Sequence, residues 1–347
     1  MTVDFLIVGQ GLAGSLLAWQ LIQRHCKVLL LDNGKENASQ IAAGLINPVT
    51  GIRLVKSTEL ELLLPVAKQT YQTLAYFFRQ PFYIEKPMLR VLQQEKERLI
   101  ALKRMNNPDY HAYLGDIITA QQFNNPLGSL EQKQTGYLLT AHLLETLKAY
   151  LISQKSYQQM QFNYADITIN TDLVWRGIKA KKIIFCEGYQ IKQNPWFSYL
   201  PLQPVKGQIL TLTTPTALPQ TLLNYGHWFI PLNQHLFRTG ATFDRDLNTD
   251  CTAVGKNNLL ASLQKVFPIN NATLIQQQAN IRPCTLDKQP FIGQHPLYPQ
   301  LVIFNGFGAK GSLQIPYYSQ KLADNLLNQQ PLPSHVAITR YESLRFF

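Results

Sequence analysis

A glycine-rich segment near the N terminus has the residue types and spacing of a phosphate-binding turn. Gly9, Gly11 and Gly14 form the pattern GxGxxG, with Leu12 and Ala13 between the last two glycines. The first glycine permits a tight turn, the second lets backbone approach a pyrophosphate, and the third allows a helix to pack closely on a strand. N–H groups at the start of the following helix, together with the helix dipole, favour negative charge. The segment is therefore predicted to bind the pyrophosphate of a dinucleotide.

The segments around this turn predict a βαβ unit. Residues 3–8 are apolar except for Asp4, which is typical of a buried parallel strand. Apolar residues recur at helical spacing over 15–24, and a second apolar run over 27–32 ends in Asp32. An acidic residue about 20 residues after the turn can accept hydrogen bonds from a ribose diol. Because a carboxylate there would repel a 2′-phosphate, the pattern argues against NADP.

Two further segments favour a flavin over a nicotinamide. After Asn33, residues 38–48 are mostly small, so their backbone could approach a flat ring system or a ribityl chain, with Ser39 as a hydrogen-bond donor. A second glycine-rich turn, residues 305–312, follows the apolar run 301–304 and precedes a helical pattern. The N terminus of that helix could face the flavin pyrimidine and stabilise reduced, anionic flavin.

The rest of the chain predicts a two-domain α/β protein. Residues 57–102 are expected to be rich in helix and 140–152 to form an amphipathic helix, whereas 205–243 alternate like an antiparallel sheet. We expect a Rossmann-like dinucleotide domain made of residues 1–75, 136–205 and 286–347. We expect an α+β substrate domain, built on the antiparallel sheet, made of residues 76–135 and 206–285.

The composition is that of a compact globular protein. Of the 347 residues 46% are hydrophobic, and no apolar run approaches the roughly 20 residues of a membrane-spanning helix. The first residues lack the basic stretch and cleavage site of a signal peptide, so we expect a cytoplasmic protein. The four cysteines are far apart and expected to be reduced, and the histidines show no zinc-like spacing, so no metal site is predicted.

The net charge of +11 would suit an anionic substrate, nucleic acid or an acidic membrane surface. Lys and Arg are scattered, however, and their densest stretch, residues 86–104, also carries Glu95 and Glu97. Interleaved charge of this kind is typical of a solvated helix face. Charge alone therefore leaves nucleic-acid binding open without favouring it.

Two more motifs make the pattern selective: Lys206-Gly207-Gln208 and Ile281-Arg282-Pro283, the latter before Gly293. With the glycine-rich turns and the segment 43–48, they resemble the D-amino-acid oxidase, glycine oxidase and sarcosine oxidase superfamily of FAD-dependent amine oxidoreductases. The resemblance covers residues 1–56, 136–150, 182–212, 228–243 and 280–327. It is strongest to the oxidase domain of the bifunctional enzymes that make methylaminomethyl-uridine in tRNA. The methyltransferase half of those enzymes has no counterpart in this sequence, so a role on tRNA stays open.

The resemblance implies a glutathione-reductase-type FAD-binding domain and an FAD that is bound non-covalently, because residues 305–312 contain no cysteine for a covalent link. Lys310 would lie near the flavin and favour its reduced anion or oxygen activation, with a solvated lysine as the alternative. The implied cofactor contacts are Gly9, Gly11, Leu12, Ala13, Gly14, Asp32, Asn33, Ser39, Gln40, Ala43, Gly44, Ile167, Gly188, Gly306, Gly308, Lys310, Gly311 and Ser312.

The resemblance also implies that Arg282 binds a substrate carboxylate. A guanidinium can hold a carboxylate with two hydrogen bonds and orient the α-carbon toward flavin N5. The alternative is a structural salt bridge between Arg282 and Asp287 or another acid. Arg53 is a weaker second candidate for the carboxylate. Further candidates to line the pocket, with core packing as the alternative, are Tyr225, His227 and Trp228.

The expected reaction is oxidation of a small-molecule amine that bears a carboxylate. Hydride would pass from the α-carbon to flavin N5 and leave an imine that water hydrolyses, so no strong catalytic base is required. Oxygen or another electron carrier would reoxidise the flavin. Three alternatives stay open: a tRNA-modifying oxidase acting on a carboxymethylaminomethyl-uridine, an NAD-dependent dehydrogenase, and a non-catalytic nucleotide-binding protein in which Arg282 is structural.

Overall fold

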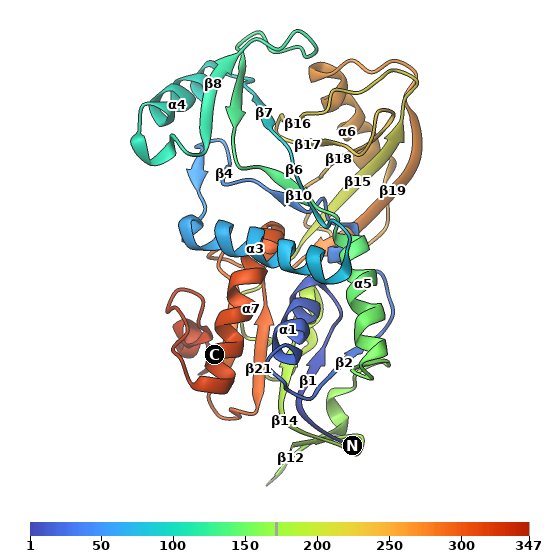
Figure 1. Cartoon of the computed structure of the whole chain (residues 1–347), viewed down its shortest axis with the longest axis vertical. Coiled ribbons are helices and arrows are strands. Elements are labelled where there is room, and N and C mark those ends of the chain that lie inside the picture. Colours follow the sequence, from blue (N-terminus) through green and yellow to red (C-terminus); the bar gives the residue numbers. More distant parts are fainter. Residues whose placement is uncertain (171–172, 347) are drawn as a thin grey trace. The chain divides into compact units, whose positions relative to one another are not determined.

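The computed structural model describes residues 1–170 and 173–346, which divide into two compact units (Figure 1). The first unit comprises residues 1–42, 140–205 and those from 281 onward. The second unit comprises residues 43–139 and 206–280. Each unit has its own sheet and its own hydrophobic core.

The first unit alternates strands with helices, as the βαβ pattern predicts. Its α-helices are α1 (Leu12–Ile22), α2 (Ala38–Ile41), α5 (Thr140–Ser153) and α7 (Gly311–Asn328). Its strands are β1 (Thr2–Val8), β2 (Val28–Asp32), β11 (Tyr157–Gln159), β12 (Ile167–Ile169), β13 (Leu173–Trp175), β14 (Ile178–Phe185), β20 (Phe291–Gln294) and β21 (Leu301–Asn305). Short 3-10 helices are η2 (Tyr164–Asp166), η3 (Gly188–Gln193), η4 (Gly308–Lys310) and η5 (Ile338–Phe346).

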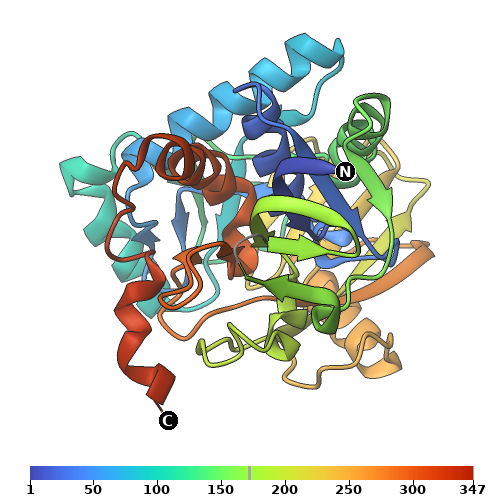
Figure 2. The same cartoon turned by 90° about the horizontal axis from the view of Figure 1, so that it is seen from below.

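Parallel strands in the order β11-β2-β1-β14-β21 form the centre of this sheet. The strands β20, β13 and β12 extend it through antiparallel pairs. Helices α1, α5 and α7 lie on one face of the sheet (Figure 2). Because parallel strands run in the same direction, their C-terminal ends share one edge. At this edge lie Gly9 after β1, Asp32 at the end of β2, Cys186 after β14 and Asn305 at the end of β21.

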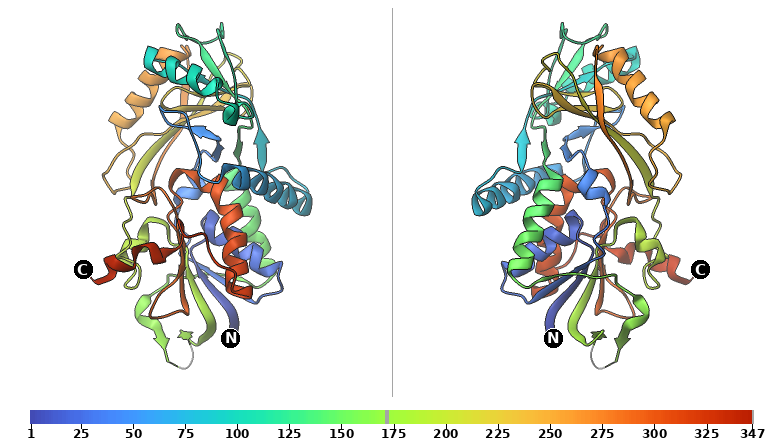
Figure 3. Two further views of the ribbon diagram at one scale, coloured as in Figure 1. Left: turned by 90° about the vertical axis from the view of Figure 1, so that its left-hand side faces the viewer. Right: turned by 90° about the vertical axis from the view of Figure 1, so that its right-hand side faces the viewer.

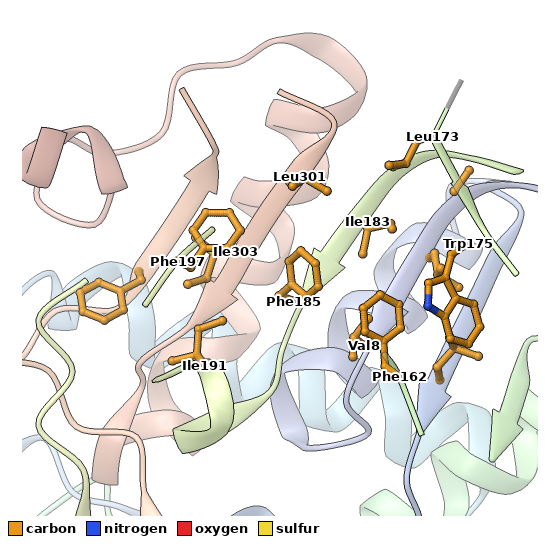
Figure 4. Packing of buried hydrophobic residues seen from close by; sticks show 14 of the residues in the cluster. Val8, Phe162, Leu173, Trp175, Ile183, Phe185, Ile191, Phe197, Leu301 and Ile303 are labelled. Atoms are coloured by element: carbon orange, nitrogen blue, oxygen red, sulfur yellow. The ribbon is translucent and has the colours of Figure 1, made fainter. Parts of the chain in front are cut away.

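The core of the first unit combines aliphatic side chains with a group of aromatic rings (Figure 4). The rings of Phe162 and Trp175 stack with centroids 4.9 Å apart, and Phe185 contacts Phe162 edge-on at 5.8 Å. Full burial of such a side chain contributes about 1.5–3 kcal/mol, so this cluster is a main source of stability for the sheet. Through Val8 and Phe185, this cluster fixes the C-terminal ends of β1 and β14.

The second unit is built on an eight-stranded, mostly antiparallel sheet. Its α-helices are α3 (Leu60–Phe78), α4 (Glu95–Met105) and α6 (Ala253–Val266), and η1 (Pro108–Tyr110) is a 3-10 helix. Its sheet contains β7 (Met88–Val91), β8 (Leu114–Ile118), β9 (Ser129–Gln132), β15 (Val205–Thr213), β16 (Leu222–Asn224), β17 (Trp228–Pro231), β18 (Leu236–Gly240) and β19 (Thr273–Arg282). Shorter strands are β3 (Leu45–Ile46), β4 (Val49–Thr50), β5 (Val55–Lys56), β6 (Tyr83–Glu85) and β10 (Gly136–Leu138).

The strand order of this sheet is β19-β15-β18-β17-β16-β7-β9-β8. The β7–β16 pair is parallel, and the neighbouring pairs from β15 to β16 and from β7 to β8 are antiparallel. Helix α6 covers one face of the sheet (Figure 3), where Leu259 and Leu263 pack in the same core as Phe229 and Phe237. The two sheets confirm the predicted fold class, a Rossmann-like α/β part combined with a part built on an antiparallel sheet.

The two compact units divide the chain differently from the predicted domains in several segments. Residues 43–75 were expected in the same domain as the glycine-rich turn, but they belong to the second unit. The reason is that β3 pairs with β10, β4 pairs with β5, and both pairs lie within that unit. The predicted boundaries also differ at 136–139, which belong to the second unit, and at 281–285, which belong to the first.

Residues 57–102 were expected to be rich in helix, and the structure confirms this, with two short strands inside the segment. The helices α3 and α4 are present, but β6 and β7 lie between them. Helix α3 ends at Phe78 before Arg79, whose left-handed backbone breaks the helix, and Pro81 and Pro87 then prevent it from resuming. The predicted helix over 140–152 is confirmed as α5.

Candidate functional site

The first glycine turn requires glycine at two positions for reasons internal to the fold. Gly9 has a φ of +105°, and a Cβ atom added there would lie 2.5 Å from the carbonyl oxygen of Cys186. A Cβ added at Gly14 would lie 2.0 Å from the carbonyl oxygen of Gly9. Both contacts are far inside van der Waals distance, so neither position accepts a side chain.

Gly11 differs from Gly9 and Gly14 because an added Cβ would meet a side chain there and not a backbone carbonyl. In the described chain, the atoms within 4 Å of a Cβ added at Gly11 belong to the Ser39 side chain, the nearest at 3.3 Å. The fold itself therefore does not exclude a side chain at Gly11. A ligand that must come close to the backbone, such as a pyrophosphate, would explain why this position is glycine.

The N terminus of α1 is suited to an anion. Its first turn carries no acidic residue, and no described side chain caps its N-cap residue, Gly11. The Ser39 hydroxyl accepts a hydrogen bond from the Leu12 N–H at 3.1 Å, which brings Ser39 to the turn as predicted. The helix dipole and the remaining N–H groups, including that of Ala13, then favour a negatively charged ligand.

Asp32 is held at the same edge by backbone hydrogen bonds. One carboxylate oxygen accepts from the Gln10 N–H at 2.8 Å, and the other accepts from the Gly34 N–H at 2.7 Å. Each oxygen keeps a second lone pair, which is what a ribose hydroxyl would need. Asn33 and Gln40 have local roles, since their side chains accept hydrogen bonds from backbone N–H groups at Lys35 and Asn37.

The C-terminal glycine turn lies in the first unit as well. Gly306 and Gly308 have φ values of +82° and +53°, a backbone region that favours glycine. The Asn305 side-chain amide donates to the Gly188 carbonyl at 2.9 Å, and the Gly308 N–H donates to the Pro283 carbonyl at 3.1 Å. These bonds bring the predicted residue Gly188 and the loop after Arg282 to the turn.

Helix α7 follows this turn and begins at Gly311, with Ser312 buried in its first turn. Its first turn also lacks an acidic residue, and its N-cap residue Lys310 makes no side-chain capping bond within the described residues. Burial, together with the nearby positive charge of Lys288, lowers the pKa of Lys310. A positive helix end and a partly buried lysine therefore lie on the same side of the turn.

Arg282 ends β19 and is half-buried beside the C-terminal turn. Burial lowers the pKa of its guanidinium, and the nearby Cys284 thiol acts in the opposite direction. The structural alternative foreseen for this arginine was a salt bridge with Asp287. Asp287 instead accepts a hydrogen bond from Arg340 at 2.8 Å. Arg282 immediately precedes Pro283, whose carbonyl accepts a hydrogen bond from the Gly308 N–H, so its positive charge belongs to the same unit as the C-terminal glycine turn.

Four further residues predicted from the sequence are Ile167 in the first unit and Ala43, Gly44 and Arg53 in the second unit. Ile167 begins β12 and packs against the core of the first unit. Ala43 and Gly44 belong to the second unit, where a Cβ added at Gly44 would lie 2.0 Å from the Leu138 carbonyl oxygen. Arg53 is exposed there, and its carbonyl accepts a hydrogen bond from Arg104.

The three pocket candidates of the second unit have structural contacts within it. The Tyr225 hydroxyl bonds the Thr239 hydroxyl at 2.6 Å, and its ring packs in the core beneath α6. The His227 ring bonds the Ala241 carbonyl at 3.2 Å, and burial lowers its pKa. Trp228, the first residue of β17, packs against a smaller core cluster made of Met88, Tyr137, Leu222 and Ile230. These contacts favour the packing interpretation for Tyr225 and Trp228.

One ionisable residue at the edge of the first sheet was not singled out from the sequence. Glu187 follows Cys186, and its carboxylate accepts hydrogen bonds from the Tyr164 hydroxyl at 2.7 Å and the Asn194 side-chain amide at 3.1 Å. Burial outweighs these bonds and raises the pKa of Glu187 to about 7. The available signal was a glutamate placed between a buried apolar strand and Gly188.

Two classes of site have no support in the described part of the chain. No three His, Cys, Asp or Glu side chains of residues 1–170 and 173–346 gather in a way that could hold a metal ion. The helices within those residues are all too short or too polar to cross a bilayer.

Comparison with known proteins agrees with this arrangement. Residues 4–325 match the family model described as FAD dependent oxidoreductase. The chain is 24% identical to the tRNA 5-methylaminomethyl-2-thiouridine biosynthesis bifunctional protein MnmC of Marinobacter nauticus, over 98% of this chain and 58% of that protein. It is 26% identical to the protein of the same name from Acinetobacter baylyi, over 94% of this chain and 53% of that one. The chain thus spans little more than half the length of these relatives.

Solved structures show the same fold. Glycine oxidase from Bacillus cereus superimposes with a TM-score of 0.82 at 20% sequence identity, covering 95% of this chain and 96% of the oxidase. Iminodiacetate oxidase from Chelativorans sp. superimposes with a TM-score of 0.79 at 20% identity, covering 97% and 98% of the two chains. At this level of identity the similarity establishes the architecture, and the chemistry must be argued from the residues.

Proposed function

Because the chain belongs to the family of FAD-dependent oxidoreductases, we propose that it oxidises an amine that bears a carboxylate, such as an amino acid or an N-substituted glycine. The observation that carries the proposal is the position of Arg282. Its loop is hydrogen-bonded to the C-terminal glycine turn through the Pro283 carbonyl and the Gly308 N–H, 3.1 Å apart. A half-buried guanidinium beside a predicted flavin-binding turn suits recognition of a substrate carboxylate.

The residues of the first unit fit the FAD that the family binds. The glycine at position 11 and the remaining N–H groups at the N terminus of α1 suit the pyrophosphate, and Asp32 suits the ribose. The N terminus of α7 and the partly buried Lys310 suit the electron-rich end of the flavin ring. When bound, the flavin supplies the chemistry by accepting a hydride from the carbon that bears the amine.

Arg282 then orients the substrate and does not take part in proton transfer. Two parallel hydrogen bonds from the guanidinium to a carboxylate fix the α-carbon in position and direction, which is what hydride transfer requires. No side-chain base is assigned, because a neutral amine needs none. Lys310 places a positive charge by the turn, and we propose that it favours the reduced state or its reoxidation by oxygen or another acceptor.

The first test is the visible absorption spectrum of the purified protein, followed by acid precipitation. We expect a flavin spectrum and release of the flavin into the supernatant, because no covalent link is proposed. Glycine, sarcosine, proline and other small amino acids are then screened for oxidation. A protein that neither contains nor takes up FAD would contradict the proposal. Bound FAD that none of the amines reduces would favour a non-catalytic role.

A second candidate function is oxidation of a carboxymethylaminomethyl group on tRNA. It is favoured by the relatives from Marinobacter nauticus and Acinetobacter baylyi, whose names refer to biosynthesis of a methylaminomethyl-thiouridine in tRNA. Such a group is also an amine that bears a carboxylate, so the same role of Arg282 applies. Binding of tRNA that weakens steeply with salt, without turnover of free amino acids, would support this candidate.

A further inference from the structure

Glu187 lies between the two glycine-rich turns at the C-terminal edge of the first sheet. Its Cα is 3.5 Å from the position of a Cβ added at Gly9, the first glycine of the phosphate-binding turn. The next residue, Gly188, accepts a hydrogen bond from Asn305, which begins the second turn. A dinucleotide that extends from one turn to the other must pass this residue.

The carboxylate of Glu187 has neutral partners. It accepts one hydrogen bond from the Tyr164 hydroxyl and one from the Asn194 amide. Burial dominates over these bonds, so the pKa of the carboxyl group rises to about 7, and it also raises the pKa of the adjoining Cys186 thiol. Further ionisable side chains on the elements around it are Asp4 on β1, Asp32 at the end of β2, Asp166 on η2, Lys179, Lys181 and Lys182 on β14, Tyr189 and Lys192 on η3, and Lys310 at the end of η4.

We propose that Glu187 couples the affinity for FAD to pH, because its neutral form accommodates the dinucleotide and its carboxylate opposes it. This inference rests on the FAD site of the proposed function. The pyrophosphate of FAD is negatively charged, and a carboxylate on the residue whose backbone adjoins Gly9 would repel it. Protonation removes that charge, so above about pH 7 binding of FAD should be accompanied by uptake of up to one proton from solvent.

The test is the dissociation constant of FAD for the flavin-free protein between pH 5.5 and pH 9, measured from flavin fluorescence. We expect a constant value below about pH 7 and weaker binding above it. Each unit by which bound FAD raises the pKa of Glu187 corresponds to about a tenfold weakening across the titration. In Glu187→Gln, whose side chain does not titrate, the dissociation constant should be independent of pH over this range.

Tyr164→Phe is the matched variant, because it keeps the carboxylate and removes one bond that stabilises it. The pKa of Glu187 should rise further, so binding should begin to weaken at a higher pH than in the wild type. If the Tyr164–Glu187 bond is purely structural, Tyr164→Phe should lower the melting temperature and leave the pH dependence of the FAD dissociation constant unchanged. A wild-type affinity that does not change with pH, or the same profile in Glu187→Gln, would overturn the inference. Absence of FAD binding at every pH would contradict the proposed function itself.

Discussion

The two glycine-rich turns of the first unit use glycine for different reasons. In the N-terminal turn, Gly9 and Gly14 are required by backbone carbonyls of the fold, at 2.5 and 2.0 Å from an added Cβ. In the C-terminal turn, an added Cβ at Gly306 or Gly308 meets side chains instead, the Thr285 methyl at 2.7 Å and the Cys284 sulfur at 3.3 Å. The first turn is fixed by main chain, and the second is enclosed by side chains that have some freedom to move.

Gly11 lies in the N-terminal turn, but an added Cβ there would meet only the Ser39 side chain within 4 Å, with the hydroxyl oxygen at 3.3 Å. A glycine without an internal reason points to a ligand as the cause. The comparison therefore separates glycines that maintain the fold from a glycine that serves binding. The following substitutions test which residues maintain the fold and which serve binding, from the largest expected effect to the smallest.

Gly14→Ala should have the largest effect, because its methyl group would lie 2.0 Å from the Gly9 carbonyl oxygen. We expect a loss of about 3 kcal/mol or more in the free energy of unfolding, as in strong overpacking. Denaturant unfolding would measure it. The control is Gly51→Ala, where φ is +73° and no described atom lies within 4 Å, so only the backbone strain of about 1 kcal/mol should appear. Equal losses in the two variants would contradict the role given to Gly14.

Arg282→Lys should weaken recognition of the carboxylate without releasing the flavin. Lysine keeps the charge but cannot form the two parallel hydrogen bonds, so we expect the Michaelis constant for an amino-acid substrate to rise about 10- to 100-fold. Steady-state kinetics would measure this, with the flavin spectrum as a check on binding. The control is Arg340→Lys, which alters the salt bridge with Asp287 and should leave the Michaelis constant unchanged. An unchanged constant in Arg282→Lys would remove the assignment.

Gly11→Ala should leave the fold intact and weaken FAD binding. The added methyl group meets the Ser39 side chain at 3.3 Å, which a small rotation relieves, but it occupies the space where backbone would approach the pyrophosphate. We expect a melting temperature of the flavin-free protein within a few degrees of wild type and an FAD affinity at least about tenfold lower, or 1.4 kcal/mol. Unfolding of the flavin-free variant would show that Gly11, too, is required by the fold.

Gly308→Ala should have the smallest effect of the four. Its left-handed backbone makes alanine unfavourable by about 1 kcal/mol, and the Cys284 side chain can move away from the methyl group. We expect a modest loss of thermal stability and a change in FAD affinity of less than tenfold. A loss as large as that of Gly14→Ala would mean that the second turn is as rigid as the first.

The sequence alone was sufficient for the elements that carry strong local signals. The strand before Gly9, the helix after it and the strand ending in Asp32 follow from apolar periodicity and glycine spacing, and the structure has all three. The same holds for the strand and helix on either side of the C-terminal turn. Fold class could be predicted because these signals are local and agree with one another.

Features that depend on distant contacts could not be predicted. The compact unit that residues 43–75 join could not be predicted, because it depends on pairing of β3 with β10, about 90 residues away in sequence. Glu187 was overlooked because its environment is created by Tyr164 and Asn194, and nothing in the local sequence specifies either contact. The ion pair between Asp287 and Arg340 could not be predicted either, because the two residues lie about 50 positions apart in the sequence.

The most direct test of the central claim is anaerobic reduction of the bound flavin by matched pairs of amines. Glycine and sarcosine are compared with their amides, which keep the amine and lack the carboxylate. The account predicts that at least one carboxylate-bearing amine, free or carried on tRNA, bleaches the visible flavin band, and that its amide does so far more slowly or only at much higher concentration. Equal reduction by an amine and its amide would contradict the role of the carboxylate and of Arg282. Failure of every such amine to reduce a fully loaded flavin would contradict the proposed reaction.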